Sequence, residues 1–194
     1  MPITYSIDAG LESLLHRYKD FPGYRWLRWP LGALLYEFIS AHGPCIDAQT
    51  PQGRIDVAVT MPANTARTFD PLSNLLTGVV EGDEVLDVWT WGFQCLRRNA
   101  ECSRPARREL KPAAYLVEPF AVEGSSVLLV DDTWTSGSSA ASASMALKRA
   151  GAQHVTVLTL GRQLNLRTAY GSTADIFDEA SRDWWDLADC VLCA

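Results

Sequence analysis

The chain has 194 residues, and a hydrophobic content of 47% is enough for one globular domain with a buried core. A formal net charge of -6 argues against a nucleic-acid-binding surface over the whole protein, because such affinity depends on massed Lys and Arg. No stretch approaches the ~20 apolar residues of a membrane span and the N-terminus does not resemble a secretory signal, so we expect a cytoplasmic protein without a membrane partner.

Strand-like and helix-like segments alternate along the chain, without internal repeats or low-complexity tracts. Such alternation implies right-handed crossovers and a parallel sheet covered by helices on both faces. The predicted class is α/β, with a single domain over residues 1–194. In chain order we expect helices over 9–19 and 31–41, a strand over 55–61, a helix from Asp70 to Gly82, strands over 84–96, 114–119 and 126–132, a helix over 138–150, a strand over 153–161, and a helix-like acidic tail from Asp175.

Two helix boundaries depend on specific residues. Gly43 and Pro44 should end the second helix, because both residues interrupt helical patterns. Asp70 followed by Pro71 predicts a helix start, with the acid as N-cap and proline at the first helical position.

Residues 97 to 111 differ in composition from their surroundings. They contain six basic and two acidic residues, a proline and no apolar periodicity. We expect a mobile, locally positive loop that can supply cations to a bound anion. The alternative is a solvated surface segment without a ligand.

The string VLLVDDTWTSGSS, residues 127–139, carries the strongest functional signal. Four apolar residues predict a strand buried on both faces, from which the chain should emerge at Asp131 and Asp132. Exposed there, the two carboxylates can accept hydrogen bonds from ribose hydroxyls or help to hold hydrated Mg²⁺. Residues 135–139 then offer hydroxyl groups, a glycine and the N-terminus of the next helix, which suit a monophosphate.

A simpler interpretation of this string is an ordinary strand-to-helix turn. Asp132 or Thr135 would then cap the helix, and Gly137 would only permit a tight bend. The coincidence of apolar run, acidic pair, hydroxyl-rich loop and helix in thirteen residues favours a ribose 5-phosphate site.

The same string resembles the phosphoribosyl pyrophosphate signature of type I phosphoribosyltransferases, and residues 10–162 resemble the ComF branch of that family in ordered blocks. The blocks are LLHRYKDF (14–21), VTMPANTARTFDPLSNLL (59–76), LRRN (96–99), ARREL (106–110) and ALKRAGAQHVTVLTLGR (146–162). The chain lacks the four-cysteine zinc segment common in that branch, and Trp134 stands where a smaller apolar residue is usual.

The resemblance implies a site in three parts. Asp131 and Asp132 would be the catalytic acids that hold the ribose diol and Mg²⁺, directly or through water. The 5-phosphate would bind to Thr133, Trp134, Thr135, Ser136, Gly137, Ser138 and Ser139. The pyrophosphate would bind to Lys19, Met61, Pro62, Ala63, Asn64, Arg67, Arg97, Arg98, Arg107 and Arg108.

The resemblance also implies a fold and an activity. We expect a type I phosphoribosyltransferase-like central parallel sheet flanked by helices, with a small hood from residues 1–54, 163–194 or both. The activity would be a glycosyltransferase (pentosyltransferase) reaction of nucleotide metabolism, in which phosphoribosyl passes from phosphoribosyl pyrophosphate to an unidentified base or small acceptor. Residues 97–111 would close as a lid.

Other readings stay open. The chain could be a non-catalytic regulatory protein that binds phosphoribosyl pyrophosphate or a nucleotide, or a ComF-like protein associated with DNA uptake. A homodimer is one assembly that the resemblance allows. Nucleic acid is not expected as the main partner, although the arginine-rich loop leaves it open.

The five cysteines do not resemble a disulfide framework, because their number is odd and their spacing irregular. Cys190 and Cys193 form a C-x-x-C pair, but a tetrahedral zinc site needs four ligands and no second well-spaced pair exists. We therefore expect reduced, ordinary thiols.

Overall fold

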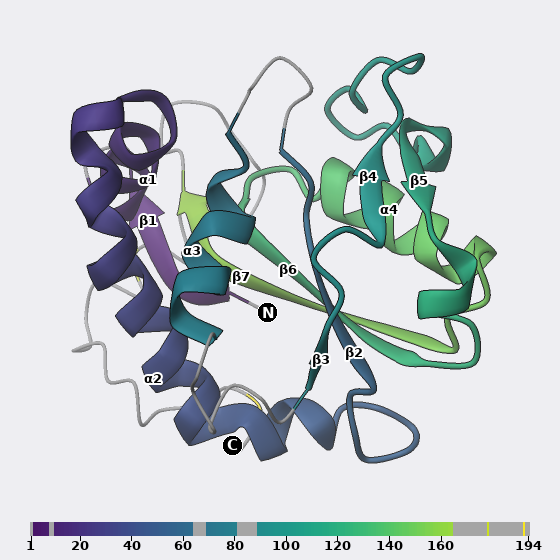
Figure 1. Ribbon diagram of the computed structural model, residues 1–194. Coiled ribbons are helices and arrows are strands. Elements are labelled where there is room, and N and C mark those ends of the chain that lie inside the picture. The colour runs from purple at the N-terminus through teal and green to yellow at the C-terminus, as the bar shows by residue number, and fades with distance from the viewer. Residues whose placement is uncertain are drawn as a thin grey trace.

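Five parallel strands form the central sheet in the part of the chain that the computed structural model describes, which comprises residues 2–7, 10–63, 69–80 and 89–164 with the isolated positions 178 and 192 (Figure 1). The strand order is β1-β7-β6-β2-β3. Their bounds are β1 Pro2–Ile7, β2 Val57–Thr60, β3 Thr90–Trp91, β6 Ser126–Trp134 and β7 His154–Leu164. A separate antiparallel pair consists of β4 Leu96–Arg98 and β5 Tyr115–Val117.

Helices flank this sheet. Figure 1 shows α1, α2 and α3 grouped at its left, and α4 together with β4 and β5 at its right. The helices are α1 Leu11–Asp20, α2 Arg28–Asp47, α3 Pro71–Val80 and α4 Ser138–Arg149, with 3-10 turns η1 Pro22–Leu27, η3 Pro112–Ala114 and η4 Pro119–Ala121. The predicted α/β class with a helix-flanked parallel sheet is confirmed.

The buried run in β6 explains why this strand lies inside the sheet. Val127, Leu128, Leu129 and Val130 are all 0% exposed. Fully burying one such side chain stabilises a fold by about 1.5–3 kcal/mol. Strands β2 and β7 pair with the backbone of β6 on either side, and because the side chains on both of its faces are buried, the run needs no polar face.

Several helix predictions are confirmed in position. Helix α1 matches the pattern over 9–19, and α4 matches the one over 138–150. Helix α3 begins at Pro71, and Asp70 Oδ1 accepts a hydrogen bond from the Ser73 backbone N at 3.1 Å, as an N-cap should. Gly82 lies outside the described residues.

The predicted helix end at Gly43 and Pro44 is wrong. Helix α2 continues through Pro44 to Asp47. A proline inside a helix removes one backbone hydrogen bond, but here Gly43 and Ile46 are buried on the same helix. Packing of this last turn against the core offsets the missing bond.

The strand predictions were less accurate than the helix predictions, both in where the strands lie and in which strands pair. The strand expected over 84–96 is the two-residue β3 followed by the start of β4, while residues 81–88 lie outside the described residues. The strand over 114–119 is present as β5, but it pairs with β4 and not with the main sheet. Strand β1, at the sheet edge beside β7, was not predicted at all.

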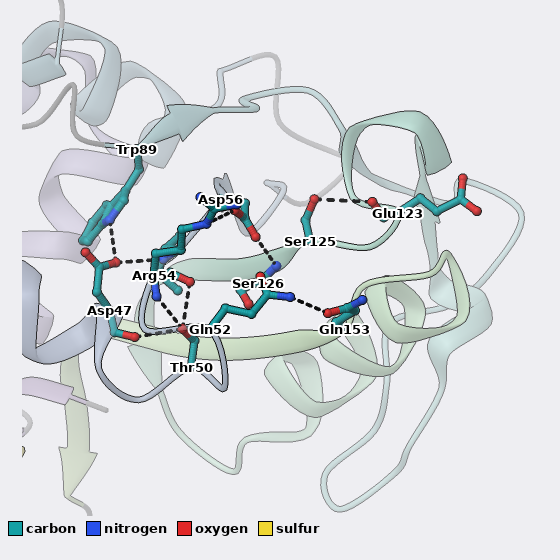
Figure 2. Close-up of polar contacts among 11 residues, drawn as sticks. Asp47, Thr50, Gln52, Arg54, Asp56, Trp89, Glu123, Ser125, Ser126 and Gln153 are labelled. Carbon is teal, nitrogen blue, oxygen red and sulfur yellow. Dashed lines mark hydrogen bonds and ion pairs between the residues drawn. The ribbon is translucent and has the colours of Figure 1, made fainter.

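Polar contacts fix the amino ends of the central strands (Figure 2). Asp47 Oδ1, at the end of α2, accepts hydrogen bonds from Ile55 N at 2.8 Å and Trp89 Nε1 at 3.0 Å. Asp56 Oδ2 accepts one from Ser126 N at 2.9 Å. This network lies at the amino ends of the strands. Because the strands are parallel, the carboxyl ends of β2 and β6 lie together at the opposite end of the sheet, where ligands bind in such folds.

Three other predictions concern the thiols and the ends of the chain. Among the described residues, Cys95 and Cys102 are free thiols, whereas Cys190 and Cys193 lie outside the described residues. The single domain and its hood stay predictions, although β1 belongs to the central sheet. Among the described residues, no helix is both long and apolar enough to cross a membrane.

Candidate functional site

A cavity of about 200 Å³ opens at the carboxyl ends of β2 and β6. Its walls come from α1, the end of β2, the start of α3, the β4–β5 unit, the end of β6 and the start of α4. The lining residues are Lys19, Met61, Pro62, Ala63, Asp70, Pro71, Leu72, Arg98, Arg104, Tyr115, Asp131, Asp132, Thr133, Trp134, Thr135, Gly137, Ser139 and Ala140.

Asp131 is buried, and the expectation that it is exposed at a strand end is wrong. Strand β6 continues to Trp134 because β7 is long enough to pair with it, so Asp131 lies within the sheet opposite Thr159 and is 9% exposed. Burial, followed by the charge of Asp132, raises the pKa of Asp131 to about 7. The side chain can therefore donate or accept a proton near neutral pH.

Asp132 forms an ion pair with Lys19 of α1. Both side chains are mostly buried, with exposed fractions of 23% for Asp132 and 17% for Lys19. The guanidinium of Arg25 donates to the backbone oxygens of Tyr18 and Lys19, which fixes the end of α1. The structure thus brings Lys19 to the acidic pair.

Arg98 has donors that find no partner among the residues that the structure describes. It lines the cavity, and its Nε and Nη1 atoms are buried without a hydrogen-bond partner. The guanidinium lies 4.8 Å from the centre of the Tyr115 ring, which holds it in place. Buried unpaired donors are costly, so this geometry favours an anionic ligand in the cavity.

Arg104 also lines the cavity, but sequence reasoning did not single it out. The available signal was its place in the basic segment 97–111, where nothing distinguished it from its neighbours. Arg97, Arg107 and Arg108, which were also predicted to bind pyrophosphate, are exposed, and they are not among the described residues that line the cavity.

Residues 97–111, which were expected to form a mobile loop, begin in strand β4 and are hydrogen-bonded to α4. Arg98 belongs to β4, which pairs with β5. Further along, Arg108 N donates to Ser138 Oγ at 2.6 Å, and Lys111 N donates to Ser142 Oγ at 2.9 Å. These contacts place the segment beside the N-terminus of α4.

The predicted phosphate loop lies at the start of α4. Thr133, Trp134, Thr135, Gly137 and Ser139 line the cavity. The other two predicted residues do not: Ser136 Oγ lies 3.1 Å from Ser138 Oγ, and Ser138 is only 7% exposed. Since the first N–H groups of a helix have no intrahelical partner, the start of α4 can bind an anion.

Gly137 is required by its backbone and by its neighbour. Its φ is +76°, in the left-handed region. A Cβ atom there would lie 2.5 Å from Cζ2 of Trp134. The indole of Trp134 therefore packs directly on the predicted phosphate loop.

Replacing Gly137 with alanine should lower the free energy of unfolding by roughly 2 kcal/mol or more, since left-handed strain alone costs about 1–2 kcal/mol. Urea unfolding measures this. Gly124→Ala is a matched control, because Gly124 has a φ of +73° and no described residue lies within 4 Å of the added Cβ. When Trp134 is already replaced by leucine, the further change Gly137→Ala should lower the free energy of unfolding only as much as the control does. Equal costs for the two single variants would show that the indole contact is unimportant.

Part of the predicted pyrophosphate loop reaches the cavity. Met61, Pro62 and Ala63 line it, and Met61 N donates to Val130 O at 2.8 Å. Asn64 and Arg67 lie outside the described residues.

The acidic pair fits Mg²⁺ when a ligand supplies further oxygens. Among the described residues, no three His, Cys, Asp or Glu side chains gather as a metal site. Mg²⁺ is usually held by one or two carboxylates together with substrate phosphates and water. Asp131 and Asp132 provide such a pair at the cavity wall.

Comparisons with known proteins add little to this site. No protein-family model matches the chain, and no curated protein does. A solved structure described as the allosteric regulatory enzyme of purine biosynthesis is 19% identical, with a TM-score of 0.38; the match covers 65% of this chain and 26% of that one. The chain thus spans about a quarter of that protein's length. At this identity the similarity says nothing of what the present chain binds.

Proposed function

We propose that this chain has the type I phosphoribosyltransferase fold, binds phosphoribosyl pyrophosphate with Mg²⁺, and transfers the phosphoribosyl group to a base or another small acceptor. The observation that carries the proposal is the pair of unpaired, buried Arg98 nitrogens in a cavity that also holds an acidic pair and a helix N-terminus. A ligand with both an anionic group and a polyol would satisfy all three features.

Each part of the donor has a matching part of the cavity. The N-terminus of α4 with Thr135 and Ser139 suits the 5-phosphate. Asp131 and Asp132 suit the ribose hydroxyls. Arg98, Arg104 and the backbone at 61–63 suit the pyrophosphate.

In the reaction, the bond between ribose C1 and the pyrophosphate oxygen breaks, and pyrophosphate leaves with the electron pair. A bond forms between C1 and the acceptor, whose proton passes to solvent or a base. The cations of Arg98 and Arg104 would stabilise the charge that develops on pyrophosphate. When bound, Mg²⁺ would neutralise part of the same charge. The chemistry depends on positioning more than on a nucleophilic side chain.

Calorimetric titration with phosphoribosyl pyrophosphate, with and without Mg²⁺, tests the binding step. We expect saturable binding that Mg²⁺ strengthens, and no binding at millimolar donor would overturn the proposal. A pyrophosphate-release assay over a panel of bases then tests transfer. Binding without release for any base would favour a non-catalytic regulatory protein.

A further inference from the structure

The backbone of Lys19 is fixed at the mouth of the acidic pair. The Arg25 guanidinium donates to the backbone oxygens of Tyr18 and Lys19. The hydroxyl of Tyr18, a residue that is 1% exposed, donates to the backbone oxygen of Pro71 at 2.9 Å and so ties the end of α1 to the start of α3. From this anchored position the Lys19 ammonium reaches Asp132 and forms the ion pair.

The formal charges that line the cavity cancel before any ligand enters. Three basic and three acidic side chains line it: Lys19, Arg98, Arg104, Asp70, Asp131 and Asp132. Protonation of one of the acids would leave the cavity positive. A divalent cation without an anion would therefore enter next to an ammonium that is only 17% exposed. Water screens the repulsion between two such charges weakly, so this entry is opposed.

We propose that Lys19 is a built-in counter-ion, which keeps free divalent cations off Asp131 and Asp132 until an anionic ligand enters the cavity. A lysine suits this role because its ammonium is a compact charge on a flexible aliphatic stem. The ammonium can turn from the Asp132 carboxylate to a phosphate oxygen while the backbone of α1 stays in place. The acidic pair is then left to the cation that accompanies the ligand.

The two halves of this proposal have different foundations. The release of Lys19 by a phosphate oxygen rests on the proposed function. The exclusion of a free cation does not, because it depends only on the ion pair and on the charges around it. The two halves are therefore tested separately.

Water proton relaxation with Mn²⁺, a paramagnetic substitute for Mg²⁺, tests the exclusion without any donor. Lys19→Met removes the ammonium and keeps most of the stem, so the variant should bind Mn²⁺ about tenfold more tightly than the parent, or better. Lys19→Arg keeps the charge and should behave as the parent does. Adding Asp132→Asn to Lys19→Met should abolish the gain. Lys148→Met removes the same charge from an exposed position near the end of α4, and as the matched control it should bind Mn²⁺ no better than the parent.

Circular dichroism establishes whether Lys19→Met is folded, and Lys19→Gln, which keeps a hydrogen-bond donor without the charge, takes its place if it is not. A parent that binds free Mn²⁺ as tightly as the folded variant, or a variant that gains nothing, would overturn the inference. So would a gain of equal size in Lys148→Met.

Inorganic pyrophosphate is the probe for the second half. Its Mn²⁺ complex should enhance proton relaxation in the presence of the parent, whereas Mn²⁺ alone should not. Equal signals with and without pyrophosphate would show that an anion does not release Lys19. Failure of the proposed function is distinguishable, because phosphoribosyl pyrophosphate would then not bind while Lys19→Met still gained affinity for Mn²⁺.

Discussion

Replacing Arg98 with methionine should weaken binding of phosphoribosyl pyrophosphate at least 100-fold without destabilising the protein. Each hydrogen bond to a charged group contributes about 1.5–3 kcal/mol, and losing two corresponds to roughly 100-fold or more. The Nε and Nη1 atoms of Arg98 have no partner within the described part of the chain, so the ligand is their expected acceptor.

The effect of Arg98→Met on stability has the opposite sign from that of most buried substitutions. Removing unpaired buried donors recovers about 1–3 kcal/mol, whereas losing the contact with Tyr115 costs about 0.5–1 kcal/mol. The free energy of unfolding, measured with urea in the absence of ligand, should stay the same or rise by ~1 kcal/mol. A structural arginine would give a loss instead.

Arg97→Met is the matched control for charge and position. Arg97 is the preceding residue of β4, but its side chain is exposed and does not line the cavity. Its replacement should change donor affinity less than threefold. If both variants lost binding equally, the effect would come from net charge and not from the placement of Arg98.

The sequence predicted the central part of the site because that part is local. An apolar run, two acids, a hydroxyl-rich loop and a helix follow one another in thirteen residues, and covalent connection alone brings them together. The same holds for Asp70, whose capping bond joins it to Ser73 three residues later.

The features that sequence reasoning missed depend on distant pairing. Asp131 is buried only because β7 extends far enough to pair with the end of β6. Arg98 reaches the cavity because β4 pairs with β5, where its partner Tyr115 lies 17 positions further along the chain. The other arginines of that segment have the same residue type and similar neighbours, so composition could not separate Arg98 and Arg104 from them.

Replacing Asp131 with asparagine should make the protein more stable at pH 8 and flatten the pH dependence of its stability. The pKa of Asp131 is raised from 3.8 to about 7 in the folded chain, first by burial and then by the charge of Asp132. At a pH between these two pKa values, Asp131 therefore takes up a proton when the chain folds. The free energy of unfolding of the parent should fall as the pH rises from about 4 to about 7, by on the order of 3 kcal/mol, and level off above.

Urea unfolding of parent and variant at intervals from pH 4.5 to 8 measures this difference. Asparagine keeps the shape of the side chain but carries no charge, so the variant should lack most of the fall and exceed the parent at pH 8. Glu101→Gln removes one exposed carboxyl charge and should keep the slope of the parent. A parent stability that rises between pH 5 and 7, or a variant with the same slope, would mean that Asp131 is ionised at little cost. The acidic pair would then be available as two full charges to a cation at all these pH values.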